Sequence, residues 1–366
     1  MIHKSKTFKE LPDPARASAL LETIATGTCC PSLSTDLPLV LYGRGALGKM
    51  AQEYLKFIGH SPVPSIEYNE EADLDSYVAV CIVTAPYVPI EQTLLKRGFK
   101  AVVPFYDLTE QFRHLHPLSN GWFAPYLSNI DKQNIKQVLE LWDDDTSRAH
   151  HLQFIAWRRL RQEWSFETAP VLTKSQQFFI PEVIEVLHNH EVFVDAGAHH
   201  GDIALEFIRI TGGKFNLLVA YEPDLDNKRA FSKKIPQNTR IEIIPYALHE
   251  MAGVAKFHSG LGLASQISDT GRDYVATYSL DSFHLPVTFI KLHLEGAELA
   301  ALKGAKHTLL KNRPIVAATV CHNADGLWET PFWLMTLLED YKFLFRLHHW
   351  CGSGGIIYAI PNERTT

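Results

Sequence analysis

The stretch VFVDAGAHHGD, residues 192–202, passes from an apolar run into an acidic residue and then through two glycines. The apolar run predicts a buried strand, and the spacing of apolar residues over 203–210 predicts a helix after the turn. Glycine has no Cβ, so Gly197 and Gly201 allow the backbone to pass close to a ligand. Open α/β sheets bind ligands at the carboxyl ends of their strands. We therefore expect a ligand here, with Asp195 facing a cationic or hydroxylic part of it.

A second acidic residue, Glu222, follows the next expected strand, residues 217–221. An acid in this position can accept two hydrogen bonds from the vicinal hydroxyls of a ribose. The glycine spacing of the first turn is Gly-x-x-x-Gly, which lacks the tighter turn of a pyrophosphate cradle. Asp195 and Glu222, in one strand–helix–strand unit, therefore predict a cofactor that contains ribose.

The pattern of strands and helices continues to the end of the chain. Further strands are expected at 241–246, 288–294 and 314–320, and helices at 227–234 and 298–311. A β-rich excursion occupies 253–280, and a final antiparallel pair is expected at 341–347 and 355–360. Parallel strands with crossover helices, closed by an antiparallel pair, predict an α/β fold with a Rossmann-like sheet.

Polar residues alternate with apolar ones in FIKLHLEGAE, residues 289–298. Side chains of a strand alternate between its faces, so Lys291, His293 and Glu295 are expected to share one face. Three polar side chains on a central parallel strand are costly unless they line a site. The sequence therefore places His293 and Glu295 nearest the site, while the alternative is that Glu295 only pairs with Lys291.

The second half of the chain, about residues 177–361, resembles the FkbM-type methyltransferase family, a branch of the class I S-adenosylmethionine enzymes. The matching segments are residues 194–198, 221–223, 279–281 and 290–298. The family usually has Asp where this chain has His293, so no acidic role is carried over to that position. The resemblance implies a cofactor, S-adenosylmethionine, and O-methylation of a hydroxyl on a sugar, glycan, polyketide or other secondary metabolite.

The resemblance also implies which residues hold the cofactor. They are the residues of the glycine turn and the second strand end, with an adenine pocket after the third strand: Asp195, Gly197, Ala198, Gly201, Glu222, Tyr246 and Ala247. The acceptor side corresponds to the strand end at Glu295. Methyl transfer to a hydroxyl needs a base that titrates near neutrality to remove the hydroxyl proton. The candidates are His293 and His322, at the ends of adjacent strands.

A metal is an alternative at the same strand ends. The side chains that would converge there are His199, His200, Asp202, His293, Glu295 and His322. Imidazole and carboxylate ligands suit zinc, iron or manganese. No short ligand spacing supports such a site, so the sequence predicts no metal.

The first half of the chain contains GRGALG, residues 43–48, between an expected strand at 38–42 and a helix that continues to residue 57. Further strands at 77–84 and 101–105 predict a small doubly wound domain. Gly-x-Gly-x-x-Gly is a dinucleotide fingerprint, for which Glu67 or Glu70 would supply the acid. The alternative is that the glycines only allow close packing and that the domain has a structural or acceptor-presenting role.

These patterns predict an N-terminal Rossmann-like domain at 1–110, a helical connector at 111–175 and a methyltransferase domain at 176–366. The N-terminal part resembles the small Rossmann-like modules that precede some sugar-modifying enzymes. Two other functions remain open. One is a nicotinamide-dependent oxidoreductase that uses the first glycine turn, and the other is a non-catalytic binding protein on the methyltransferase fold.

Composition limits the partners. The 366 residues are 46% apolar and carry a net charge of −6, so no overall charge steers the protein to nucleic acid or an anionic membrane. The basic cluster at 157–161 is interpreted as a solvated helix face. Five cysteines without a metal or disulfide spacing, no signal peptide and no apolar run of ~20 residues predict a cytoplasmic protein. The expected partner is a small-molecule or glycan acceptor, and the oligomeric state is left open.

Overall fold

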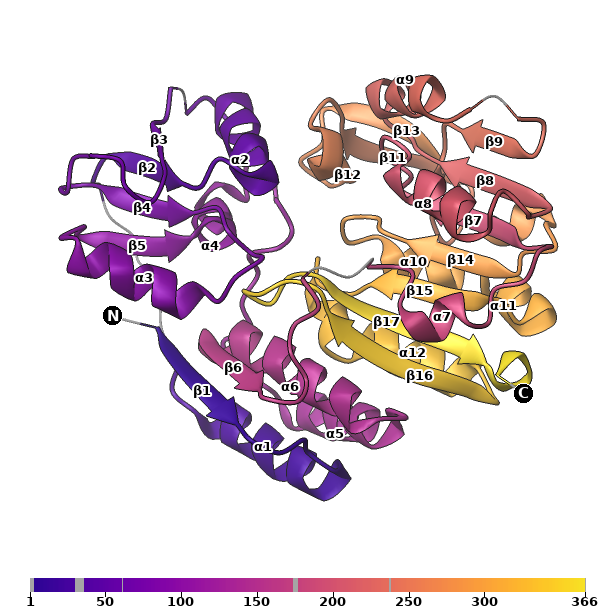
Figure 1. Cartoon of the computed structure of the whole chain (residues 1–366). Helices are drawn as coiled ribbons and strands as arrows, with labels where there is room; N and C mark the ends of the chain where they lie inside the picture. The colour runs from indigo at the N-terminus through magenta and orange to yellow at the C-terminus, as the bar shows by residue number, and fades with distance from the viewer. Residues whose placement is uncertain (1–2, 30–35, 61, 174–176, 237, 366) are drawn as a thin grey trace. The chain divides into compact units, whose positions relative to one another are not determined.

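The computed structural model describes residues 3–29, 36–60, 62–173, 177–236 and 238–365, and they form two compact units (Figure 1). The first unit comprises Met1–Lys174, Cys321–Ala324 and Phe345–Gly355. The second comprises Ser175–Val320, Asp325–Leu344 and Ile356–Thr366. The chain thus crosses between the units more than once, whereas the domain limits expected from the sequence follow one another and stay a prediction.

The first unit contains a four-stranded parallel sheet. Its strand order is β3 (Ser65–Ile66), β2 (Leu39–Tyr42), β4 (Tyr77–Val80) and β5 (Ala101–Pro104). Helix α2 (Ala46–Phe57) leads from β2 to β3, and α3 (Tyr87–Lys96) leads from β4 to β5 in the opposite direction along the sheet. Right-handed crossovers in opposite directions place helices on opposite faces, so the doubly wound prediction is confirmed.

Helices and a two-stranded sheet accompany this sheet in the first unit. Helix α1 (Pro14–Thr26) contacts both α5 (Asn129–Leu141) and α6 (Asp145–Leu160), and the short helix α4 (Phe105–Thr109) follows β5. Within the expected helical connector, helix α6 ends at Leu160, because Arg161 adopts a left-handed backbone conformation with φ +52°. The chain continues as β6 (Gln162–Phe166), which pairs in parallel with β1 (Lys4–Phe8).

The basic cluster on α6 is buried, so its interpretation as a solvated face is wrong. The Arg158 guanidinium has no exposed surface and donates to the carbonyls of Asn120, Trp122, Cys321 and Gly352 at 2.6–3.0 Å. Burial lowers the pKa of Arg158 to about 9. Arg161 pairs with Asp107 at 2.8 Å. These arginines tie loops of the first unit together, because a buried cation needs acceptors in place of water.

The second unit contains a seven-stranded sheet. Its strand order is β16 (Tyr341–Leu347), β17 (Gly355–Pro361), β15 (Ile315–Thr319), β14 (Phe289–Leu292), β7 (Val192–Ala196), β8 (Leu217–Tyr221) and β9 (Ile241–Ile244). The strands from β15 to β9 are parallel, and β17 is antiparallel to β15. The predicted Rossmann-like sheet is therefore confirmed, with β7 and β14 at its centre.

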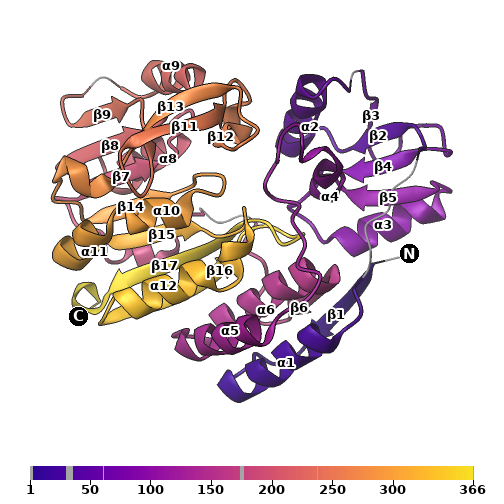
Figure 2. The same ribbon diagram turned by 180° about the vertical axis from the view of Figure 1, so that it is seen from behind.

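Helices cover both faces of this sheet. Short helix α7 (Pro181–Ile184) precedes β7, while α8 (Asp202–Ile210) and α9 (Leu225–Lys234) follow β7 and β8. Figure 2 brings the helices of the other face to the front: α10 (Glu298–Lys303), α11 (Lys306–Asn312) and α12 (Glu329–Leu337). The single helix predicted at 298–311 is therefore two helices.

The β-rich excursion forms a small second sheet in this unit. Its order is β10 (Ala247–Leu248), β13 (Asp273–Tyr278), β11 (Gly253–His258) and β12 (Gln266–Ile267). Strand β11 is antiparallel to both neighbours, whereas β10 is parallel to β13. The segment between β11 and β12 therefore returns to the same sheet, and it includes a turn of 3-10 helix at Gly262–Ala264.

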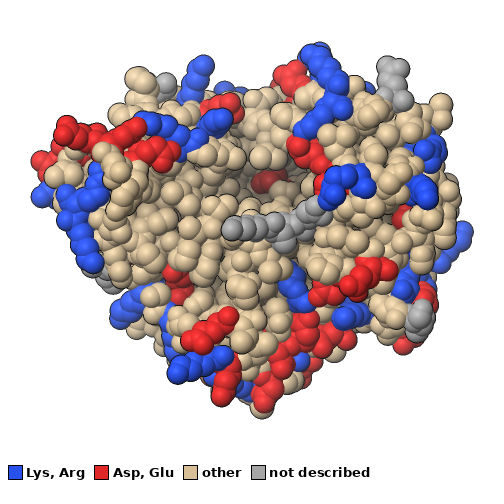
Figure 3. Space-filling model, viewed as in Figure 1, with Lys and Arg blue, Asp and Glu red and all other residues tan. Residues whose placement is uncertain are grey.

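Three properties of the chain bear on the expected location and partners. In the described part of the chain, no helix is both long enough and apolar enough to span a bilayer. Cys29, Cys81, Cys321 and Cys351 are free thiols, whereas Cys30 lies outside the described residues. On the face shown in Figure 3, lysine and arginine side chains lie among aspartate and glutamate side chains without forming an extended basic area.

Candidate active site

The glycine turn after β7 is docked onto the neighbouring strand β8. The amides of Gly197 and Ala198 donate to the Tyr221 carbonyl at 2.9 and 3.2 Å. Gly197 has φ +74°, and a Cβ there would lie 2.0 Å from the His293 carbonyl oxygen. Only glycine allows this approach, so the turn after β7 and the turn after β14 meet through their backbones.

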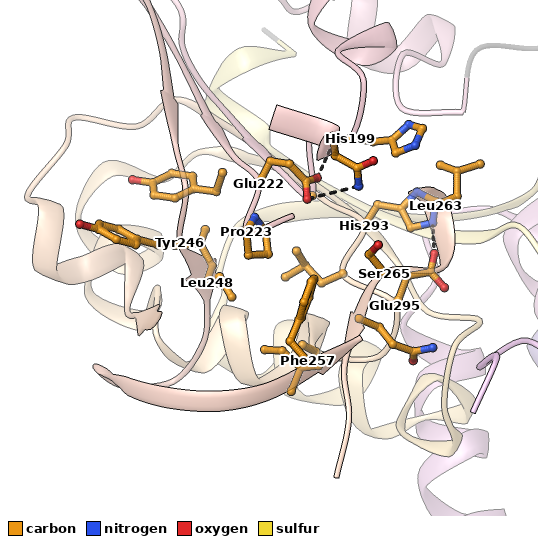
Figure 4. Close-up of a pocket in the computed structure, with 18 of the residues that line it drawn as sticks. His199, Glu222, Pro223, Tyr246, Leu248, Phe257, Leu263, Ser265, His293 and Glu295 are labelled. Carbon is orange, nitrogen blue, oxygen red and sulfur yellow. Dashed lines mark hydrogen bonds and ion pairs between the residues drawn. The ribbon is translucent and has the colours of Figure 1, made fainter. Parts of the chain in front are cut away.

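A cavity of about 600 Å³, counted with the open space at its mouth, lies at these strand ends. Figure 4 shows Glu222 and Pro223 between Tyr246 and Leu248 on one side and His199, His293 and Glu295 on the other. The excursion sheet supplies further wall residues: Phe257, Gly262, Leu263, Ser265, Gln266 and Ile267. The cavity therefore has an aromatic and aliphatic end and a polar end.

Glu222 lies at the middle of the cavity wall, 5% exposed. Its carboxylate accepts hydrogen bonds from the His199 amide at 2.7 Å and the Asp224 amide at 3.0 Å. Burial raises the pKa of Glu222 to about 7, although these hydrogen bonds and that from Asn227 favour the charged form. The carboxylate thus joins the two predicted halves of the cofactor site, the turn after β7 and the end of β8.

Asp224 fixes the segment that forms the outer wall. One carboxylate oxygen caps α9 by accepting from the amides of Asp226 and Asn227. The other accepts from the Gly260 amide and the Ser265 hydroxyl, both at 2.7 Å. This buried residue therefore connects the strand end that carries Glu222 with the part of the excursion that lines the cavity.

Asp195 is completely buried and does not line the cavity. One of its oxygens accepts from Lys291 Nζ at 2.8 Å, and the same ammonium donates to the carbonyls of Ala196 and Gly197. The other oxygen, Oδ2, has no hydrogen-bond partner in the described structure. The buried pair holds the glycine turn against β14, and a direct contact of Asp195 with a cofactor stays a prediction.

His293 and Glu295 pair with each other, so the alternative pairing of Glu295 with Lys291 is wrong. His293 Nε2 lies 3.0 Å from Glu295 Oε1. Strand β14 ends at Leu292, and Glu295 adopts φ +51° in the turn that follows. The expected alternation along the strand therefore stops before these residues, and the turn brings their side chains together at the polar end of the cavity.

His199 also faces this end of the cavity. Its ring stacks on that of His200 with centroids 3.6 Å apart. Desolvation, followed by the neighbouring His200, lowers the pKa of His199 to about 4. His199 is therefore neutral at physiological pH, and a pKa this low makes it a weak base for removing a proton from an acceptor.

The predicted site residues fall into three groups. Those that line the cavity are Gly197, Glu222, Tyr246, Ala247, His293 and Glu295. Asp195, Ala198 and Gly201 do not line it, and Gly201 is the N-cap of α8, where a Cβ would lie 2.9–3.0 Å from side-chain atoms of Phe231 and Ile235. His322 lies in the segment Cys321–Ala324, which belongs to the first unit.

Sequence reasoning missed the wall that the excursion supplies, including Phe257, Leu263 and Ser265. The excursion reaches the cavity through long-range hydrogen bonds to Asp224 and Asn227 at the start of α9. The sequence offers little signal for such contacts. The acid Asp224, directly after the Glu-Pro pair, was the available sign that another segment is anchored there.

The glycine turn of the first unit resembles the site in one respect. The Arg44 amide donates to Glu67 at 2.8 Å, just as the His199 amide donates to Glu222. A Cβ on Gly48 would lie 2.0 Å from the Gly43 carbonyl oxygen, so the close approach of α2 to the turn after β2 requires this glycine. The Arg44 guanidinium pairs with Glu70. A nucleotide at this turn stays a hypothesis.

Comparisons with known proteins agree with this geometry. Residues 195–345 match the family profile described as the Methyltransferase FkbM domain. The crystal structure of methyltransferase FkbM from Methylobacillus flagellatus KT is similar in fold, with a TM-score of 0.61 and 17% sequence identity over 95% of this chain and 100% of that chain. No curated protein sequence matches the chain at a significant level. Residues 195–345 thus resemble the FkbM methyltransferase domain in sequence, and the chain shares its fold with one methyltransferase of that name.

Proposed function

We propose that the second unit is an S-adenosylmethionine-dependent O-methyltransferase whose acceptor is a hydroxyl of a sugar, glycan or other secondary metabolite. The observation that carries the proposal is one cavity bounded by Gly197, Glu222 and the His293–Glu295 pair. The same cavity is lined by the residue expected to bind the ribose of a cofactor, Glu222, and by a candidate base, His293. The family match supports methyl transfer as the reaction.

The residues present fit an adenosyl cofactor. Glu222 offers a carboxylate for two ribose hydroxyls, and Tyr246, Leu248 and Phe257 offer apolar surface for an adenine ring. At the other end, Gly197 lines the cavity, and the orphaned Asp195 Oδ2 is a buried acceptor two residues before it in the chain. S-adenosylmethionine would supply a methyl group that its sulfonium already activates.

The protein then has to orient the acceptor oxygen and accept its proton. His293 is half-buried at the cavity wall and its Nε2 is paired with Glu295. A carboxylate beside an imidazole orients the ring and stabilises the imidazolium that forms when the ring takes a proton. This pair supports His293 as the base and Glu295 as its orienting partner, and His322 stays a candidate.

The charge of the lining favours a neutral acceptor. Among the described residues that line the cavity there are two carboxylates, Glu222 and Glu295, and no lysine or arginine. A phosphorylated or carboxylated acceptor is normally recognised by a cationic side chain. A neutral hydroxyl compound fits this lining better than an anionic one.

Calorimetry with S-adenosylhomocysteine and with NAD, followed by a methyl-transfer screen over sugar and polyketide hydroxyls, tests the proposal. We expect S-adenosylhomocysteine to bind and at least one hydroxyl acceptor to be methylated. Tight binding of NAD alone would favour the oxidoreductase, and binding without transfer to any acceptor would favour a non-catalytic binding protein.

Exchange of Glu222 is expected to remove a pH dependence of cofactor binding. Burial holds the pKa of Glu222 near 7, so the carboxylate that accepts both ribose hydroxyls is lost as the pH falls through 7. In the wild type, the affinity for S-adenosylhomocysteine should therefore rise between pH 6 and 8. Glu222→Gln should bind roughly 10- to 100-fold more weakly at pH 8 and show little pH dependence.

The effect on folding has the opposite sign, which separates it from binding. The pKa of Glu222 is higher in the folded chain than its usual value of 4.5. This group therefore favours folding fully below its unfolded pKa, and the contribution is lost as the pH rises to about 7. Titration calorimetry at several pH values measures the affinity for S-adenosylhomocysteine. The free energy of unfolding, measured at the same pH values, gives the effect on folding. An affinity in the wild type that does not change with pH would contradict the assignment of Glu222.

A further inference from the structure

We propose that the buried carboxylate of Glu298 is a positioning residue that holds the turn carrying His293 and Glu295, so that their pair stays closed. The proposal rests on the proposed function, since it concerns the acceptor end of the same cavity. Glu298 does not line the cavity and would act only through the two residues that do.

Both oxygens of Glu298 bind the backbone of that turn. Oε1 accepts from the Leu294 amide at 3.0 Å, and Oε2 accepts from the Gly296 amide at 2.9 Å. These amides flank Glu295 on either side. Glu298 itself is the first residue of α10 and is 4% exposed, so water does not substitute readily for these hydrogen bonds.

The backbone of the turn explains why such support is needed. Glu295 adopts φ +51° and Gly296 φ +111°. The left-handed region is unfavourable for a residue with a Cβ, so Glu295 keeps this conformation only where the surroundings impose it. This conformation is the one in which Glu295 Oε1 lies 3.0 Å from His293 Nε2. The Glu298 carboxylate therefore supports the pair by binding the amides on both sides of the strained residue.

Thr319 attaches this carboxylate to the sheet. Its hydroxyl lies at the end of β15 and donates to Glu298 Oε1 at 2.6 Å, with a longer contact to the Leu292 carbonyl at 3.3 Å. The ends of β14 and β15 and the start of α10 thus meet at one carboxylate. A site held by strands and a helix in this way keeps its geometry more closely than one on a free loop.

The test compares Glu298→Gln with wild-type protein. The amide has nearly the same shape but replaces one acceptor with a donor, so either the Leu294 or the Gly296 amide loses its partner. We expect kcat to fall by roughly 10- to 100-fold, because small displacements of reacting groups have effects of this size. The affinity for S-adenosylhomocysteine and the KM for the methyl donor should change by less than about twofold.

Asp281→Asn is the matched control. Asp281 accepts from the amides of His307 and Thr308 and from the Thr308 hydroxyl at the start of α11, but it does not contact the turn after β14. It should destabilise the protein to a similar degree and leave kcat unchanged. Thr319→Val should lower kcat less than Glu298→Gln does, and Thr319→Ser should restore it.

Two further measurements separate positioning from stability. The double variant His293→Asn with Glu298→Gln should be no slower than His293→Asn alone, because both changes act through the same base. Imidazole NMR signals of His293 should move in Glu298→Gln and not in Asp281→Asn, which is independent of turnover. An unchanged kcat or unmoved His293 signals in Glu298→Gln would overturn the proposal. Absence of methyl transfer by the wild type would instead contradict the proposed function, and the NMR comparison would still test the role of Glu298.

Discussion

His293→Asn is expected to lower kcat by about 10²- to 10⁴-fold, the range for loss of a general base. The imidazole lies at the polar end of the cavity, with Nε2 3.0 Å from Glu295 Oε1. Asparagine keeps a polar side chain, shorter than the imidazole, but cannot take a proton from an acceptor hydroxyl. Initial rates at saturating cofactor and acceptor measure the loss.

Two comparisons show whether the loss comes from proton transfer. S-adenosylhomocysteine should bind to His293→Asn and wild type with similar affinity, because the cofactor contacts proposed for Glu222 and Gly197 are untouched. His322→Asn, measured beside it, tests the other candidate base. Unchanged turnover in both variants would remove histidine from the mechanism.

Lys291→Met is expected to lower the free energy of unfolding by about 3–5 kcal/mol, the usual cost of breaking a buried ion pair by removing one partner. Asp195 has no exposed surface, and its second oxygen already lacks a partner in the described structure. Removal of the ammonium leaves this carboxylate without its cation. The carbonyls of Ala196 and Gly197 lose the same donor.

The double variant Lys291→Met with Asp195→Asn is the control. It removes the uncompensated charge and should recover most of the lost stability, since a neutral pair of similar volume is tolerated where a lone charge is not. Urea denaturation of the three proteins at one pH measures the difference. A loss below about 1 kcal/mol in Lys291→Met would contradict a buried ion pair that holds the glycine turn.

The sequence predicted the α/β fold of both halves because their strands are short, apolar and punctuated by glycine turns and helical spacing. The strand at 217–221 coincides with the parallel strand β8. Buried parallel strands need apolar residues on both faces, so their limits are visible in composition alone. The prediction that the arginines of α6 face solvent was wrong, because their burial depends on long-range contacts. The carbonyls that bind Arg158 come from loops distant in the sequence.

The residues of the candidate site divide in the same way. Gly197, Glu222 and His293 were predictable because each follows a strand at the edge where parallel sheets bind ligands, and local sequence fixes that position. Only the tertiary structure decided that Lys291 pairs with Asp195 and Glu295 with His293. Strand alternation placed Lys291, His293 and Glu295 on one face, but the strand ends at Leu292, and a left-handed turn held by long-range contacts determines where the side chains point.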